Sequence, residues 1–168
     1  MFVIIISKKI KSSLTGIVKE LFLNLYNMEA SNILIEKIKE FEGFSNTAYT
    51  CPAGVWTCGF GTTKNITATT TCTKQEAEKW LRRDIIPISK YVNTIPEIDT
   101  QGKFDAVVDF IYNLGVGNFQ SSTLYKKIKA KAKTSEIVAE FNRWVYAGKK
   151  KLPGLVKRRA WESQRWQE

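Results

Sequence analysis

The chain of 168 residues contains no histidine. Histidine is the commonest metal ligand and the usual base of nucleophilic triads, so its absence excludes His-dependent triads and most metal chemistry. The three cysteines, Cys51, Cys58 and Cys72, are odd in number and match no zinc-binding spacing. We therefore expect no metal and no cofactor, and carboxylates remain as the groups for acid–base chemistry.

Long apolar runs are also missing. The opening "MFVIII" has six apolar residues before Ser7, Lys8 and Lys9, whereas a membrane-spanning helix needs roughly 20. No basic region precedes this run and no small-residue cleavage site follows it, so we do not interpret it as a signal peptide. We expect no stable insertion into a membrane.

Positive charge is distributed unevenly along a chain whose formal net charge is +10. Residues 126–168 hold 13 Lys and Arg against 4 Asp and Glu, which is most of the surplus. A basic face of this kind fits a polyanionic partner, such as nucleic acid, an anionic membrane surface or an anionic cell-wall polymer. The alternative is a solvated face without a partner.

The first 30 residues read as an extension to a single domain at 31–168. Apolar residues at helical spacing predict an amphipathic helix over "LTGIVKELFLNLY", from Leu14 to Tyr26. This helix could pack on the domain or lie on a membrane surface. A third reading is that the natural start is Met28, because a self-contained pattern begins just after it.

Helix signals dominate the domain itself. Ser31 or Asn32 can cap a helix that ends at Gly43, and Thr73 with Glu76 forms a capping box for the next helix. Between them, short strands surround the turn signal "PAG", and "TATTTCT" reads as a loop. The remaining patterns predict helices over 99–114, from Ser121 or Ser122 onward, over 134–147 as far as Gly148, and after "KKKLPG".

Glu42 is the only charged residue between Phe41 and Thr63. It falls in the last turn of the first predicted helix, where the partial negative charge of the helix end raises a carboxyl pKa. Aromatic neighbours would desolvate it further, so Glu42 is a candidate general acid. Taken alone, it could equally be a solvated residue at a helix end.

The expected hairpin places two further side chains near Glu42. If "PAG" is a three-residue loop, Cys51 faces Val55 and Tyr49 faces Thr57. Side chains alternate along a strand, so we expect Trp56 and Phe60 to point into the core. Cys51 and Thr57 would then share the opposite face and look across a cleft at Glu42.

These residues carry a family resemblance. Glu42, Cys51 and Thr57, separated by eight and five residues within "FEGFSNTAYTCPAGVWTCGFGTT", resemble the catalytic signature of the phage-type lysozymes, or endolysins. The stretches "FDAVVDFIYNLGVGNFQSSTLYKKI" and "FNRWVYAGKKKLPGLVKRRAWE" are similar to the helical lobe of that family. The resemblance implies an α+β, mainly helical fold, in which a small lobe with a β-hairpin and a larger helical lobe flank a glycan cleft.

The resemblance also implies an activity, namely hydrolysis of the β-1,4 bond between N-acetylmuramic acid and N-acetylglucosamine. Glu42 would be the general acid, Cys51 the second catalytic group, and Thr57 a holder of the attacking water. Glycan contacts would fall at Thr63, Tyr112 and Thr123. The sequence departs from the family pattern at two positions. Cys51 stands where Asp is usual, although Cys is a known alternative in the family, and Thr62 stands where His is common.

The same resemblance implies the setting. The expected partner is bacterial peptidoglycan, reached from the host cytoplasm once a holin breaches the membrane, and the protein would be a monomer. Two other classes compete: a wall-binding module that has lost catalysis, and a basic nucleic-acid-binding protein. No helix-turn-helix, zinc-finger or RNA-binding signature supports the latter, so we expect no nucleic-acid partner.

Overall fold

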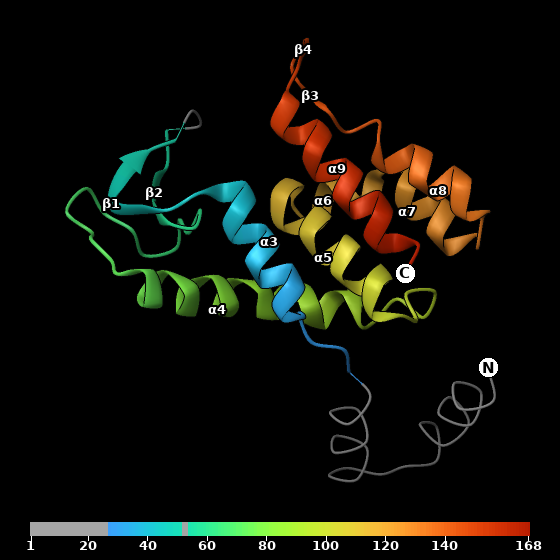
Figure 1. Ribbon diagram of the computed structural model, residues 1–168, viewed down its shortest axis with the longest axis horizontal. Coiled ribbons are helices and arrows are strands. Elements are labelled where there is room, and N and C mark those ends of the chain that lie inside the picture. Colours follow the sequence, from blue (N-terminus) through green and yellow to red (C-terminus); the bar gives the residue numbers. More distant parts are fainter. Residues whose placement is uncertain (1–26, 52–53) are drawn as a thin grey trace, which may run out of the picture.

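The computed structural model describes residues 27–51 and 54–168, so the helix expected at Leu14–Tyr26 lies outside the described residues. The described chain has a small lobe and a larger helical lobe (Figure 1). Its elements in chain order are α3 (Asn32–Glu42), β1 (Ser45–Thr50), β2 (Trp56–Gly59), α4 (Lys74–Val92), α5 (Gln101–Leu114), α6 (Val116–Ser121), α7 (Thr123–Lys129), α8 (Thr134–Phe141), β3 (Tyr146–Ala147), β4 (Lys150–Lys151) and α9 (Pro153–Trp166).

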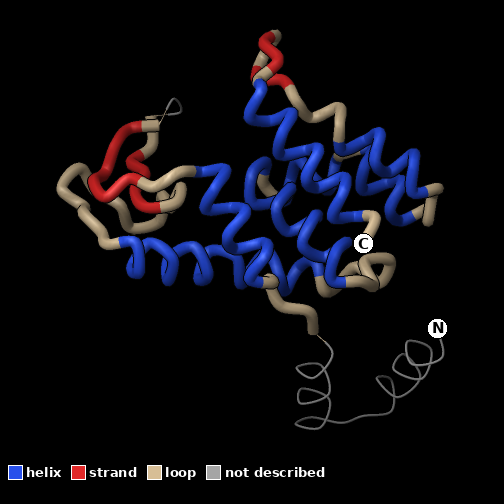
Figure 2. Tube along the Cα trace, viewed as in Figure 1, coloured by secondary structure: helices blue, strands red, loops and turns tan. Residues whose placement is uncertain are grey.

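The small lobe is built on the antiparallel pair β1–β2. Tyr49 lies opposite Thr57, and the backbone N–H of Cys51 donates to the carbonyl of Val55 at 3.0 Å. This is the register expected from the sequence. Residues 70–72 lie along the other side of β1, where the N–H of Cys72 donates to the carbonyl of Asn46 at 2.9 Å. The hairpin and these loops form one end of the molecule (Figure 2).

The helix ends confirm the capping signals in the sequence. The Ser31 side chain accepts the N–H of Leu34 at the start of α3, and Gly43 ends this helix with φ +70°. Thr73 and Glu76 form the reciprocal capping box of α4. These caps matter for the site, because they place Glu42 at the last position of α3, where the chain leaves for the small lobe.

Helix α5 lies at the centre of the helical lobe. Its residues 104–111 are all buried, and α9, α4 and α3 pack around it. The 19-residue α4 runs along one side of the molecule beneath both lobes (Figure 1). None of the helices in the described part of the chain combines the length and apolar character that crossing a membrane would need.

Three details differ from the sequence predictions. Trp56 is 40% exposed, so its expected core position is wrong, although Phe60 is buried. Trp56 is the first residue of β2 and pairs with Thr50, the last residue of β1, near the end of the described part of the hairpin. The helix expected to reach Gly148 ends at Phe141, and Gly148, with φ +59°, turns the β3–β4 hairpin instead. The short α6, between Gly115 and Ser122, was not anticipated.

Candidate active site

Glu42 is held by an ion-pair chain from the helical lobe. Nη1 of Arg158, on α9, donates to Oε1 of Glu42 at 2.6 Å. The same guanidinium donates through Nε and Nη2 to both oxygens of Asp109, on α5, at 2.9 and 2.8 Å. Asp109 and Arg158 are buried, whereas Glu42 is partly exposed. One buried arginine therefore joins α3, α5 and α9 at the candidate acid.

The two carboxyl groups beside Arg158 determine its charge state. Burial alone would lower the pKa of Arg158, but the charges of Asp109 and then Glu42 outweigh it, and the pKa is raised above its ordinary value. Arg158 therefore stays charged at every physiological pH. Arg158 thus bridges two carboxyl groups, that of Asp109 in the core and that of Glu42 beside the cavities.

Gly61 explains part of the "GFG" motif. Its φ is +87°, and a Cβ added there would lie 3.3 Å from Oε2 of Glu42. Both the left-handed backbone and the close approach favour glycine. The loop after β2 can therefore pass directly beside the Glu42 carboxylate.

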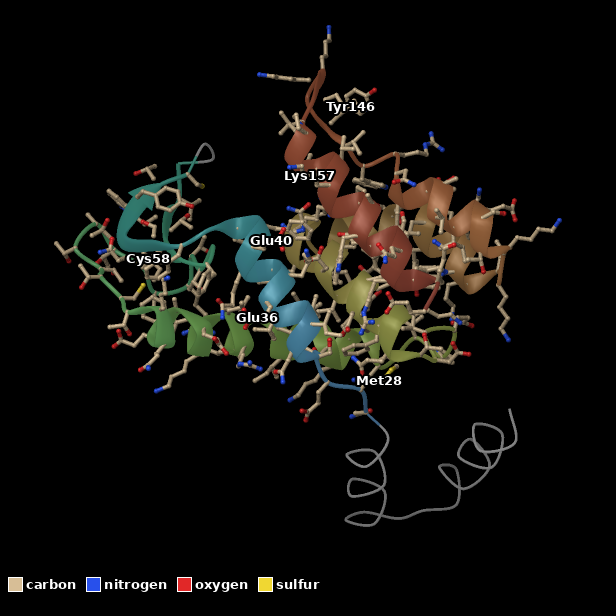
Figure 3. All side chains as sticks on the ribbon, in the orientation of Figure 1. Met28, Glu36, Glu40, Cys58, Tyr146 and Lys157 are labelled. Carbon is tan, nitrogen blue, oxygen red and sulfur yellow. The ribbon has the colours of Figure 1, made fainter. Side chains whose placement is uncertain are left out.

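Two cavities meet at Glu42. The first, of about 320 Å³, runs along the small-lobe side and is lined by Glu42, Gly61, Thr63, Lys64, Asp84, Ile88, Tyr112 and Asn113. The second, of about 560 Å³, lies between α3 and the start of α9, and is lined by Glu40, Phe41, Glu42, Asn113, Leu152, Pro153, Gly154, Leu155, Lys157 and Arg158. Figure 3 shows Glu40 and Lys157 on the two helices that border the second cavity. The two cavities share Glu42 and Asn113 in their linings, so both open beside the candidate acid.

Tyr112 ties the two lobes together beside these cavities. Its hydroxyl donates to the carbonyl of Phe60 at 2.9 Å. Burial, followed by the negative charges of Glu42 and Asp84, raises the pKa of Tyr112 above its ordinary value, so the phenol stays protonated. Nearby, the hydroxyl of Thr62 donates to Oδ2 of Asp84 at 3.0 Å. Thr62, at the position where a histidine is common in the family, thus forms a hydrogen bond to Asp84 on α4.

Cys51 and Thr57 lie together on the hairpin. The N–H of Cys51 and the hydroxyl of Thr57 both donate to the carbonyl of Val55, at 3.0 and 3.1 Å. The hydroxyl proton of Thr57 is therefore engaged, while its oxygen lone pairs can still accept a hydrogen bond. Neither residue lines the two cavities, and their roles toward Glu42 stay predictions.

Two of the three residues expected to contact the glycan line a cavity, and the third does not. Thr63 and Tyr112 line the small-lobe cavity with Glu42. Thr123 is exposed at the first position of α7 and lines neither cavity, so its glycan contact stays a prediction. Arg158, Asp109 and Asn113 are not among the site residues that the sequence predicts. Arg158 and Arg159, in "VKRRAW", are treated in the sequence analysis as part of the basic surface. Their position on a predicted helix with apolar neighbours is the signal that could have predicted their burial.

Comparisons with known proteins agree with this geometry. The family model of phage lysozyme matches residues 39–162. An endolysin of Acyrthosiphon pisum secondary endosymbiont phage 1 is 40% identical over 127 residues, which cover 73% of this chain and 86% of that protein. A SAR-endolysin of Enterobacteria phage PA-2 is 35% identical over 128 residues, covering 73% and 75% respectively.

Among solved structures, the muramidase domain of SpmX from Asticaccaulis excentricus superimposes with a TM-score of 0.76 at 29% identity. The match covers 83% of this chain and 98% of that domain. The expected architecture, a small hairpin lobe beside a larger helical lobe, is confirmed. The chain therefore belongs to the phage lysozyme family and is a peptidoglycan-hydrolysing enzyme.

Proposed function

We propose that this enzyme hydrolyses the β-1,4 bond between N-acetylmuramic acid and N-acetylglucosamine, with Glu42 as the general acid. The observation that carries the proposal is the place of Glu42 at the junction of two cavities. A glycan that runs through both would place one glycosidic bond beside this carboxyl group. A proton donor at that point can protonate the leaving oxygen.

Arg158 fixes the geometry of the acid. The guanidinium holds Oε1 of Glu42, and the other oxygen, Oε2, lies beside Gly61. Oε2 is therefore the oxygen that we assign to the leaving group. In the proposed step Glu42 acts with a proton on Oε2, which it transfers to the leaving oxygen.

The hairpin side supplies the attacking water in this proposal. Cys51 and Thr57, which converge on the carbonyl of Val55, would hold a water on the face of the sugar opposite to Glu42. This water attacks C1 as the bond to the leaving oxygen breaks and Glu42 transfers its proton. The water then loses a proton to solvent, and Glu42 is reprotonated from solvent. One displacement of this kind inverts the anomeric centre.

The direct test is lysis of outer-membrane-permeabilised bacteria, with release of reducing ends measured in parallel. We expect clearing and reducing-end release by the wild type, and neither by Glu42→Gln. Binding of the wild type to walls without reducing-end release would make it a binding module, and binding to DNA alone would make it a nucleic-acid-binding protein. Either result would overturn the proposed function.

We also propose that the enzyme is held in the host cytoplasm until a holin opens the membrane. The basic residues 126–168 would then favour its association with the anionic wall. Some relatives are named SAR-endolysins, so cells must be fractionated before lysis to test the route. A soluble cytoplasmic pool, and lysis only when a holin is co-expressed, is the expected result. A membrane-bound pool, or lysis without a holin, would contradict this route.

A further inference from the structure

Asn113 shares both cavities with Glu42. Among the described residues that line the two cavities, only Glu42 and Asn113 line both. Asn113 lies in the last turn of α5 and is partly exposed. A glycan that occupied both cavities would therefore pass both side chains.

The orientation of the Asn113 amide is set by a buried arginine. Nη2 of Arg159 donates to Oδ1 of Asn113 at 3.0 Å. A guanidinium has no acceptor, so only the oxygen of the amide can face it, and the amide nitrogen must point the other way. Arg159 is fully buried, paired with Glu162 at 2.6 Å and stacked 4.9 Å from the ring centroid of Phe110. The amide is thus held by a group that has little freedom to move.

The amide nitrogen remains available for a ligand. Within residues 27–51 and 54–168, the Asn113 side chain makes its hydrogen bond through Oδ1, and Nδ2 donates to no protein group. Because the oxygen is engaged, Asn113 offers the cleft donors alone. A donor-only group matches a carbonyl oxygen, which only accepts, better than a sugar hydroxyl, which can do either. The glycan carries such a carbonyl in the acetamido group at C2 of each sugar.

We propose that Asn113 recognises the acetamido group of a sugar next to the scissile bond, through a hydrogen bond from Nδ2 to the acetamido carbonyl. Arg159 is the positioning residue that keeps the amide nitrogen toward the cleft. The inference rests on the proposed function, since it needs a glycan in both cavities. It makes Asn113 a determinant of selectivity for N-acetylated glycans.

The test compares peptidoglycan with the same material after chemical N-deacetylation, which replaces acetamido groups by ammonium groups. Wild-type kcat/KM should be higher on the acetylated glycan. Asn113→Ala should lose about tenfold in kcat/KM on the acetylated glycan, the size expected for one hydrogen bond, and little on the deacetylated one. Asn113→Asp keeps an oxygen for Arg159 but presents an acceptor to the cleft, so its preference should move further toward the deacetylated glycan.

Asn142→Ala is the matched control, because Asn142 is exposed at the end of α8 and outside both cavities. It should leave both rates unchanged. An acetylated-to-deacetylated ratio that is the same in wild type, Asn113→Ala and Asn113→Asp would overturn the inference, even if both variants were slower. That result would leave the proposed function standing. A wild type that releases no reducing ends would instead overturn the proposed function and this inference with it.

Discussion

The two sides of Glu42 are built differently. On the helical side, buried Arg158 and Asp109 form three hydrogen bonds that tie α3, α5 and α9 to the carboxyl group. On the hairpin side, the backbone N–H of Cys51 and the hydroxyl of Thr57 donate to the carbonyl of Val55, in a sheet of two short strands whose Trp56 is 40% exposed. Glu42 is thus held by a buried residue of the helical lobe, whereas the candidate water site lies on the hairpin of the small lobe.

This difference indicates a division of labour. In the proposed function, a general acid must keep its position relative to the leaving oxygen. Arg158 holds Glu42 by one hydrogen bond and is itself held by a buried bidentate pair with Asp109, at a cost in desolvation. In the proposed function, the group on the opposite face of the sugar only has to orient a water molecule, so its chemical identity can vary more. The presence of Cys51, where aspartate is usual in the family, fits this division.

The largest expected effect is on the acid itself. Replacing Glu42 with Gln keeps the size of the side chain but removes the transferable proton. Activity should fall by about 10²–10⁴-fold or to background, as loss of a general acid does. Reducing-end release and thermal unfolding should be measured together. Near-normal activity in a folded Glu42→Gln variant would end the assignment of Glu42.

Next in size is the buried arginine. Arg158→Met leaves Asp109 buried without its partner, which costs about 3–5 kcal/mol in the free energy of unfolding. Urea unfolding of this variant should be compared with that of Lys37→Ala, which removes an exposed pair with Glu40 and should change little. Equal, small effects of the two substitutions would mean that the helical side is not the rigid side.

The hairpin side should be more tolerant. Cys51→Asp restores the residue that is usual in the family, and we expect it to retain activity. Cys51→Ala removes the group that orients the water and should cost about 10²-fold in kcat. Both variants should unfold at nearly the same temperature as the wild type. Loss of activity in Cys51→Asp, with full activity in Cys51→Ala, would exclude the proposed role.

The smallest expected effect lies in the core of the small lobe. Burial, with the neighbouring Cys58 thiol 3.3 Å away, raises the pKa of Cys72 to about 12. The unfolded thiol has a pKa of about 8.5. The folded state therefore favours the thiol, and its stabilisation is complete below pH 8.5 and is lost as the pH rises toward 12.

Urea unfolding under reducing conditions can measure this effect. The free energy of unfolding of the wild type should fall relative to that of Cys72→Ala between pH 8 and pH 10.5. The comparison within a pH series cancels the titration of groups remote from Cys72. A difference that does not change with pH would contradict the burial of this thiol.

Local signals predicted much of this architecture. Ser31, Gly43 and the capping box at Thr73 act through residues a few positions away, so their roles can be read from the sequence. The hairpin register was predicted in the same way, from the length of the "PAG" loop.

The missed features depend on distant contacts. Arg158 is 116 residues from Glu42 along the chain, and Asn113 gains its role only from the orientation that Arg159 imposes. Trp56 is likewise exposed at the start of β2, and the alternation of side chains along a strand does not determine what surrounds that position.

The central claim is that Glu42 protonates the leaving oxygen while a water held on the hairpin side attacks C1 directly. The anomeric form of the first product tests it most directly. NMR spectra taken within the first minutes of digestion, before mutarotation, should show the α-anomer. A retained β-anomer would mean that the protein itself, through Cys51, forms a bond to the sugar, and would contradict direct attack by water.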